Sequence, residues 1–293
     1  MENFINYFGQ SLAYVLLGIF IFFAGKFIKD ILTPFNDDKE LTEKDNPALG
    51  LSVMGYYLGI MIIYIGATLG PAISPDAYLT NEEYYKDVGI QLGITAIWSF
   101  AGIFFLNIAR GLLDKVNLRG VPLAKEIIND KNMGAGAIEF GSYIASALII
   151  AASIYGETGN WVTAVLFFVL GQSSLIVFTA LYQKITPFDI ISQINKDNNA
   201  VGVALAGNLI AIGLVVAGAA TVPFETWDTT LVDFGINLGL GIVFLLIGRF
   251  VADKVLLPGT SLNHEIENDR NVAAAFIESA AVISFAALIF ILI

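Results

Sequence analysis

Hydrophobic residues run along the chain in long blocks that are separated by short charged segments. We distinguish eight blocks, at residues 8–31, 48–70, 88–110, 133–155, 160–182, 199–220, 234–250 and 271–293. Most blocks have about the 20 residues that an α-helix needs to cross the hydrocarbon core of a bilayer. A membrane-spanning β-barrel would instead alternate polar and apolar residues in shorter strands. The pattern therefore predicts an all-α integral membrane protein with eight transmembrane helices.

The composition supports this class and excludes others. Hydrophobic residues make up 56% of the chain and charged residues only 14%, whereas soluble domains have about 25% charged residues. Cysteine is absent and His264 is the single histidine, so we expect neither a disulfide nor a metal site. No nucleotide-binding, hydrolase or metalloprotease motif occurs, so we expect no enzyme and no cofactor. The net charge of −11 argues against nucleic acid as a partner.

Basic residues are confined to alternate segments between the blocks. All of the 15 Lys and Arg residues except Lys86 lie in or beside the segments that follow the first, third, fifth and seventh blocks. Cytoplasmic loops of membrane proteins concentrate Lys and Arg. We therefore expect a multi-pass membrane protein with its N- and C-termini on the non-cytoplasmic side. The lysines of the first block follow its apolar run, which predicts an uncleaved helix rather than a signal peptide.

A long charged segment occurs twice in the chain. The sequence RGLLDKVNLRGVPLAKEIINDKN at 110–132 aligns without a gap with RFVADKVLLPGTSLNHEIENDRN at 249–271. This predicts two tandem four-helix units, at residues 1–156 and 157–293. A weaker echo, in which DKN at 130–132 and DNN at 197–199 both open a Gly- and Ala-rich helix, predicts that each unit consists of two-helix repeats. Because each repeat has an even number of helices, the repeats are parallel rather than inverted.

These motifs resemble those of a known family. Helices in YjfL-like bacterial inner-membrane proteins (domain of unknown function 350) open with D-x-N or DN-x-A-x-G elements. This chain has DNPALGLSVMG at 45–55 and DNNAVGVALAG at 197–207, besides the DKN already quoted. The resemblance covers nearly the whole chain as two tandem copies. It implies a fold of paired two-helix repeats and a location in the bacterial inner (plasma) membrane, but no established activity.

Two glutamates lie inside apolar helices at equivalent positions of the repeat. Glu139 stands in GAGAIEFGSYIASAL and Glu278 in AAAFIESAAVISF, each about 10 Å below the cytoplasmic surface. An ionised carboxylate at that depth costs several kcal/mol unless it is paired, hydrated or protonated. One interpretation is a proton- or cation-binding site in the bundle. The other is a carboxylate that only holds neighbouring helices together.

Further polar residues could support either interpretation. Arg110 and Arg249 end the third and seventh blocks, where they either reach the interface or form ion pairs with Glu139 and Glu278. Such pairing would keep the carboxylates charged and argue against proton transport. Intramembrane amides usually link helices, with about 0.6–2 kcal/mol each. The amides in question are Asn107, Asn208 and Asn237.

Acidic residues precede the fourth and eighth blocks. Asp130 and Asp269, with the preceding Asn129 and Asn268, are suited to cap the helices that follow. Alternatively, they form the cytoplasmic mouth of an ion path. Capping does not explain two further glutamates in the same heptapeptides, which could belong to an acidic rim or to a solvated linker. They are Glu126 and Glu265.

Two functions are compatible with these features. The first is permeation of protons, small cations or a small solute, with Glu139 and Glu278 as coupling or selectivity groups. The second is a non-transporting membrane scaffold or envelope-stress component, whose charged loops dock a cytoplasmic protein partner and whose small-residue helix faces form a homo-oligomer in the lipid bilayer. Glutamates that line a hydrated cavity would favour permeation, and glutamates that pair with the arginines would favour the scaffold.

Overall fold

A computed structural model describes residues 2–69, 73–78, 80–116, 120–155, 161–221, 224–256 and 259–292. Eight helices in these ranges are long and apolar enough to cross a membrane, as the sequence predicts. They are α1 (Glu2–Leu32), α3 (Pro47–Thr68), α4 (Asn81–Val116), α6 (Met133–Ile154), α7 (Trp161–Ile185), α9 (Asn199–Ala220), α10 (Trp227–Val255) and α12 (Val272–Leu292). Short helices separate them: α2 (Asp37–Thr42), η1 (Pro75–Ala77), α5 (Leu123–Ile128), α8 (Ile190–Ile194) and α11 (Leu262–Glu267).

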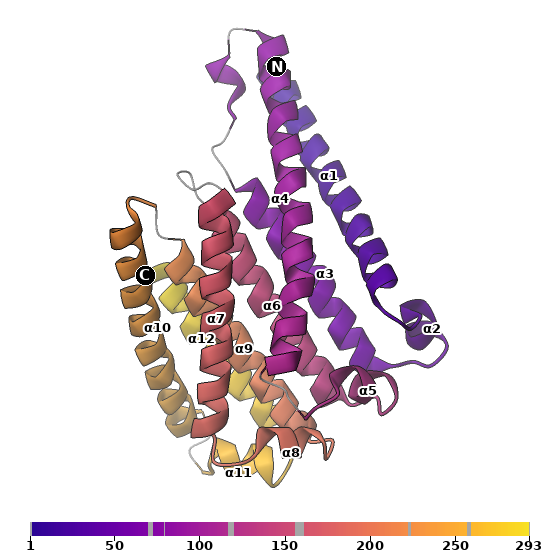
Figure 1. The fold of residues 1–293 in the computed structure, drawn as a ribbon, viewed down its shortest axis with the longest axis vertical. Coiled ribbons are helices and arrows are strands. Elements are labelled where there is room, and N and C mark those ends of the chain that lie inside the picture. The colour runs from indigo at the N-terminus through magenta and orange to yellow at the C-terminus, as the bar shows by residue number, and fades with distance from the viewer. Residues whose placement is uncertain are drawn as a thin grey trace.

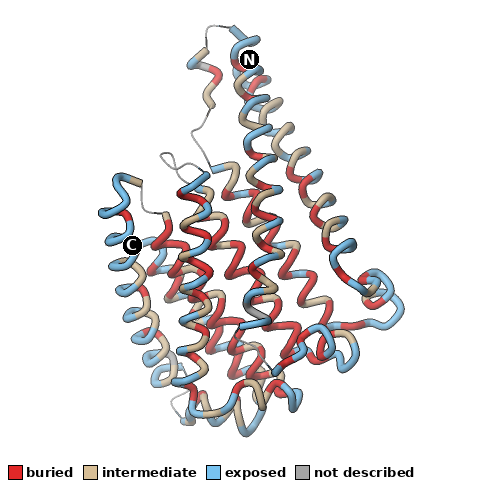
Figure 2. Tube along the Cα trace, viewed as in Figure 1, coloured by how far each residue is buried: buried red, intermediate tan, exposed pale blue. Residues whose placement is uncertain are grey.

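The same three-element arrangement occurs four times along the chain (Figure 1). A long outer helix descends to a short helix, and an inner helix returns from it. The outer helices are α1, α4, α7 and α10, and the inner helices are α3, α6, α9 and α12. The inner helices pack in a row, α3 on α6, α6 on α9 and α9 on α12. The buried residues are concentrated along this row, above all in α6 and α9 (Figure 2). Two-helix parallel repeats therefore build both four-helix units.

Each inner helix begins at an asparagine that follows a sharp turn. The residue before the asparagine has a φ of 48–58°, which is uncommon outside glycine. These turn residues are Asp45, Lys131, Asp197 and Arg270. The asparagine side-chain oxygen then accepts a hydrogen bond from a backbone N–H in the first helical turn, the usual N-cap arrangement. The caps are Asn46, Asn132, Asn198 and Asn271.

The sequence predicted capping by Asp130 and Asp269, but the capping residues lie two positions further along, at Asn132 and Asn271. The positive φ falls on Lys131 and Arg270, so the aspartates belong to the turn and the asparagines enter the helix. Asp130 is exposed and its carboxylate lies 3.9 Å from the Lys125 amine. Asp269 is likewise exposed, 3.9 Å from His264.

The cap asparagines also connect successive repeats. The Asn46 amide donates to the carbonyl of Ile127 over 2.9 Å. The Asn132 amide donates to the carbonyl of Ile194 over 2.9 Å, and Asn198 to that of Ile266 over 3.0 Å. Each acceptor lies in the short helix of the next repeat. The hydrogen bonds therefore fix the register of the row at the end of the molecule that carries α2, α5, α8 and α11.

Small residues allow the inner helices to approach closely. A methyl group added at Gly141 of α6 would lie 2.7 Å from the Cα of Ala206 in α9. Some glycines of the outer helices also meet the inner row, as Gly102 of α4 does at Ile63, but a methyl group on Gly93 of α4 would meet nothing within 4 Å. The same holds for Gly235 of α10, so these two positions make no close helix contact within the chain.

We expect Gly141→Ala to lower the midpoint of unfolding in detergent–SDS mixtures, because the added methyl group forces α6 and α9 apart. Overpacking of this kind typically costs about 1–3 kcal/mol. Gly93→Ala is the matched control, because it makes the same change within another helix but in open space. It should leave the midpoint unchanged or raise it slightly. Equal losses in the two variants would contradict close packing between α6 and α9.

The first unit has longer outer helices than the second. Helix α4 has 36 residues and α10 has 29. The N-terminal ends of α1 and α4 project together beyond the rest of the bundle (Figure 1). Polar side chains join them there: Asn6 donates to Asn81 over 2.9 Å, Tyr85 to Asn6 over 2.8 Å and Tyr84 to Gln10 over 2.7 Å. The two projecting ends thus form one paired element.

Candidate functional site: two arginine–glutamate pairs

Glu139 and Arg110 form an ion pair inside the first unit. The Nε atom of Arg110 lies 2.5 Å from Oε1 of Glu139. The glutamate side chain is only 3% exposed and the arginine side chain 24% exposed. The carboxylate is therefore withdrawn from solvent, and the guanidinium connects it to the outer part of the bundle.

The antiparallel course of outer and inner helices brings these residues together. Arg110 lies at the end of the apolar stretch of α4, near the short helices. Glu139 lies seven residues after the cap Asn132, about 10 Å along the α6 axis at 1.5 Å per residue. Because α4 packs against α6, both side chains reach the same level of the bundle.

Aromatic and amide groups surround the first pair. The guanidinium carbon of Arg110 lies 6.0 Å from the centre of the Tyr143 ring, at the limit of a cation–π contact. Nearby, Asn107 donates to the Tyr56 hydroxyl over 3.4 Å and to the Ile103 carbonyl over 2.8 Å. The Tyr56 hydroxyl in turn donates to the carbonyl of Gly25 over 3.2 Å. Asn107 thus links α4 to α3, and Tyr56 links α3 to α1.

Glu278 and Arg249 form the corresponding pair in the second unit. Nη2 of Arg249 lies 3.6 Å from Oε1 of Glu278, and the side chains are 22% and 2% exposed. The guanidinium carbon lies 4.8 Å from the centre of the Tyr182 ring. Asn208 donates to Oε1 of Glu278 and to the Tyr182 hydroxyl, each over 3.3 Å. This pair is looser than the first, but it has a direct amide partner.

The two units differ at two supporting positions. Tyr56 occupies the place of Asn208, ten residues after the cap in each case. The sequence TPFN at 33–36 matches TPFD at 186–189, and this match aligns Lys29 with Tyr182. Lys29 forms a buried ion pair of 2.5 Å with Asp37. Neither Tyr182 nor the Lys29–Asp37 pair was predicted from the sequence. Only the TPF alignment could have indicated that they matter.

The remaining predicted site residues lie elsewhere. Asn237 is half-buried, twelve residues before Arg249 on α10, and none of the described contacts joins it to the pair. Glu126 accepts from the cap Asn132 over 3.1 Å, and Glu265 accepts from the cap Asn271 over 2.9 Å. The Asn271 hydrogen bond, with a second from Thr260, lowers the pKa of the Glu265 carboxyl. These two glutamates therefore support the caps.

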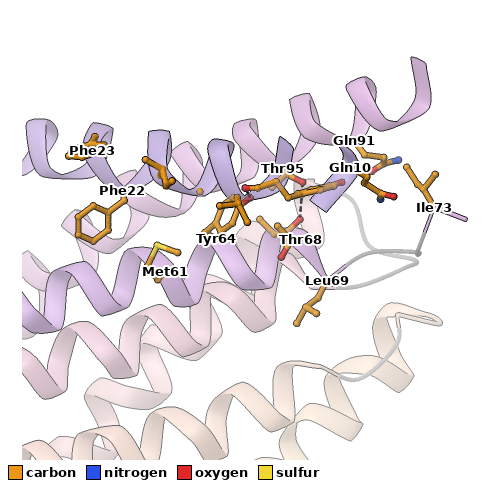
Figure 3. Close-up of a pocket in the computed structure, with 15 residues that line it drawn as sticks. Gln10, Phe22, Phe23, Met61, Tyr64, Thr68, Leu69, Ile73, Gln91 and Thr95 are labelled. Atoms are coloured by element: carbon orange, nitrogen blue, oxygen red, sulfur yellow. Dashed lines mark hydrogen bonds between the residues drawn. The ribbon is translucent and has the colours of Figure 1, made fainter. Parts of the chain in front are cut away.

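Two of the cavities that the described residues line lie between the helices, and neither of these two has Glu139 or Glu278 in its lining. One of about 180 Å³ is mostly apolar and touches Arg249, Asn208 and Tyr182. One of about 800 Å³ lies between α1, α3 and α4. Figure 3 shows its apolar end at Phe22, Phe23 and Met61, and its polar end at Gln10, Gln91 and Thr95. Among the described residues, no three His, Cys, Asp or Glu side chains are grouped to hold a metal ion.

The fold and the paired charges define a polytopic α-helical membrane protein of two tandem four-helix units. The chain belongs to the family described as Domain of Unknown Function (DUF350), whose model matches residues 3–154 and again residues 157–293. The chain is also similar to the "UPF0719 transmembrane protein" of Aquifex aeolicus (strain VF5). The two are 22% identical over 278 residues, which cover 90% of this chain and 96% of the relative. No solved structure matches the chain.

Proposed function

We propose that the protein is a non-transporting membrane scaffold that presents a charged surface to a cytoplasmic partner. The pairing of both buried glutamates with arginines carries this proposal. A carboxylate that binds and releases protons or cations needs an exchangeable partner and a path to water. Here each carboxylate has a fixed cation within 3.6 Å and lies outside the lining of both cavities. The pairs are therefore suited to hold helices in place.

The surface around α2, α5, α8 and α11, which we call the short-helix surface, provides the docking site in this proposal. Nearly all Lys and Arg residues lie at that end of the bundle, so the positive-inside rule places it in the cytoplasm. The termini then lie outside the cytoplasm, and the membrane is a bacterial inner membrane. Exposed charges of both signs cover this end, among them Lys39, Lys125, Asp130 and Lys196. Such a mixed surface suits a protein partner of matching charge pattern.

Ion flux through proteoliposomes tests the proposal against permeation. We expect the parent protein to pass protons, potassium and sodium no faster than empty liposomes, because its buried carboxylates are neutralised by arginines. Flux in the parent that disappears in Glu139→Gln/Glu278→Gln would overturn the scaffold and establish permeation. A Lys125→Gln variant serves as the matched control, since it alters a charge only at the exposed end.

Affinity capture from solubilised membranes tests directly whether the protein binds a cytoplasmic partner. A partner held by the short-helix surface should be retained by the parent and lost from a Lys39→Glu/Lys125→Glu variant. The Glu139→Gln/Glu278→Gln variant should retain it as long as the protein remains folded.

A further inference from the structure

Each of the first three inner helices presents one face to the next inner helix. The residues two, nine, thirteen and twenty positions after the cap form this face, which we call the forward face. They are Ala48, Gly55, Gly59 and Gly66 in α3, Gly134, Gly141, Ala145 and Ala152 in α6, and Ala200, Gly207, Ala211 and Gly218 in α9. All twelve are Gly or Ala and all are buried. Small residues at this spacing let neighbouring helices approach closely in a membrane.

The last inner helix has the same face without a neighbour. The corresponding residues of α12 are Ala273, Ala280, Ser284 and Ile291, and all four are exposed. Three of them are still small, and Ser284 places a hydroxyl on a surface that would otherwise meet only lipid.

The first inner helix, α3, has an uncovered face on its opposite side. Each later inner helix receives its predecessor through residues four, eight, fifteen and nineteen positions after the cap, which we call the receiving face. In α6 these are Gly136, Phe140, Ala147 and Ala151, which meet Ala48, Gly55, Gly59 and Gly66 of α3. The corresponding residues of α3 are Gly50, Met54, Met61 and Ile65. Met54 and Ile65 are exposed and the other two half-buried, so this face is open within one chain.

The asparagine caps indicate independently that a neighbouring repeat is missing at each end of the row. Asn132 donates both to Glu126 in its own repeat and to Ile194 in the next one. Asn271 donates to Glu265 in the same way, but the described residues offer it no acceptor in a following repeat. In the first repeat, Leu41 occupies the position of the acceptors Ile127 and Ile266, five residues before the cap. The row thus ends in an amide donor at α12 and begins with the matching carbonyl at α2.

The packing of the outer helices shows the same missing neighbour before α3. Helix α4 packs on both α3 and α6, α7 on α6 and α9, and α10 on α9 and α12. Helix α1 packs on α3 but has no preceding inner helix within the chain. The cavity of about 800 Å³, with Met61 in its lining, lies between α1, α3 and α4 (Figure 3).

We propose that α12 of one copy packs against α3 of a second copy, continuing the row of inner helices from molecule to molecule. The contact is an extension of the three interfaces already present in the chain, with the forward face of α12 on the receiving face of α3. The register pairs Ala280 with Met54 and Ser284 with Met61, small residues against long flexible ones. Such a head-to-tail contact is heterologous and builds a ring or an open array. It goes beyond the proposed function, because it does not depend on what the protein carries or docks.

Cysteine cross-linking tests this contact cleanly, because the chain has no cysteine of its own. We expect an Ala280→Cys chain and a Met54→Cys chain, co-expressed in one membrane, to form a disulfide-linked dimer under mild oxidation. Each variant alone should remain monomeric on the gel, because a head-to-tail contact does not place like residues together. Co-expressed Gly93→Cys and Gly235→Cys chains measure random collision, since both positions border open space.

The outcome decides between a second copy and lipid. Cross-linking of the mixed pair no stronger than that of the collision control would show that only lipid covers α12, and would overturn the proposal. A dimer from Ala280→Cys alone would overturn it in favour of a symmetric contact. As a further check, Ala280→Leu should reduce oligomers in native membranes to monomers without changing the unfolding midpoint, because the residue is exposed in the single chain.

Discussion

Replacing Arg110 by glutamine is expected to lower the free energy of unfolding by about 3–5 kcal/mol, the usual cost of removing one partner from a buried ion pair. The partner left behind is Glu139, whose side chain is 3% exposed. It would then be a buried carboxylate without its nearest cation. Fraction folded against SDS content in mixed micelles, followed by tryptophan fluorescence, measures the change.

Three matched variants make this expectation specific. Glu139→Gln should cost less than Arg110→Gln, because the arginine left behind is 24% exposed and can extend its head toward water. The double variant Arg110→Gln/Glu139→Gln should recover most of the loss, since no unpaired charge remains. Lys125→Gln removes an exposed partner at 3.9 Å and should cost less than about 1 kcal/mol. Equal losses for Arg110→Gln and Lys125→Gln would show that the buried pair does not stabilise the fold.

Replacing Asn198 by alanine is expected to lower the free energy of unfolding by about 2–4 kcal/mol, from the lost cap and the buried groups left without partners. The Asn198 side chain caps α9 by accepting from the Val201 N–H. Its amide also donates to the carbonyls of Ile266 and Glu267 and to Gln193. One substitution therefore removes both the N-cap of α9 and the hydrogen bonds that link two repeats. The same SDS titration measures the loss.

Asn271→Ala is the natural comparison. This residue caps α12 by accepting from Ala273 and Ala274, but within the chain its amide donates only inside its own repeat. In detergent monomers its substitution should cost only about 1 kcal/mol, the typical value of a cap. A loss as large as that of Asn198→Ala would mean that the link between repeats adds little.

The transmembrane helices and their repeats were predictable from the sequence because each signal is long. A run of about 20 apolar residues has few alternatives in a membrane protein, and the segments at 110–132 and 249–271 align without a gap. The short helices were not predicted, because five or six residues are too few to show a period. The cap position was also missed. DKN and the residues before it offer several capping side chains, and only the positive φ of Lys131 selects Asn132.

The candidate site was predicted in its parts but not in its arrangement. The equivalence of Glu139 and Glu278 follows from the repeat, and pairing with Arg110 and Arg249 was one of two alternatives. The sequence could not decide between them, because the choice depends on the rotation of α4 and α10 about their own axes. Tyr182 was missed for a related reason. An aromatic residue in an apolar helix has no periodic signal that distinguishes a cation–π partner from a packing residue.

The paired ends of α1 and α4 have a consequence for the space outside the membrane. At 1.5 Å per residue, the 36 residues of α4 extend about 54 Å, against a hydrocarbon core of about 30 Å. To fit that length into the hydrocarbon core by inclination alone, the helix would have to tilt by about 56°, well outside the roughly 0–40° found for membrane helices. Part of the excess therefore lies beyond the hydrocarbon core as a stiff post, formed by the projecting N-terminal ends of α1 and α4 (Figure 1). A wall or a sheet of material running parallel to the membrane would touch this post before it reached any other part of the molecule.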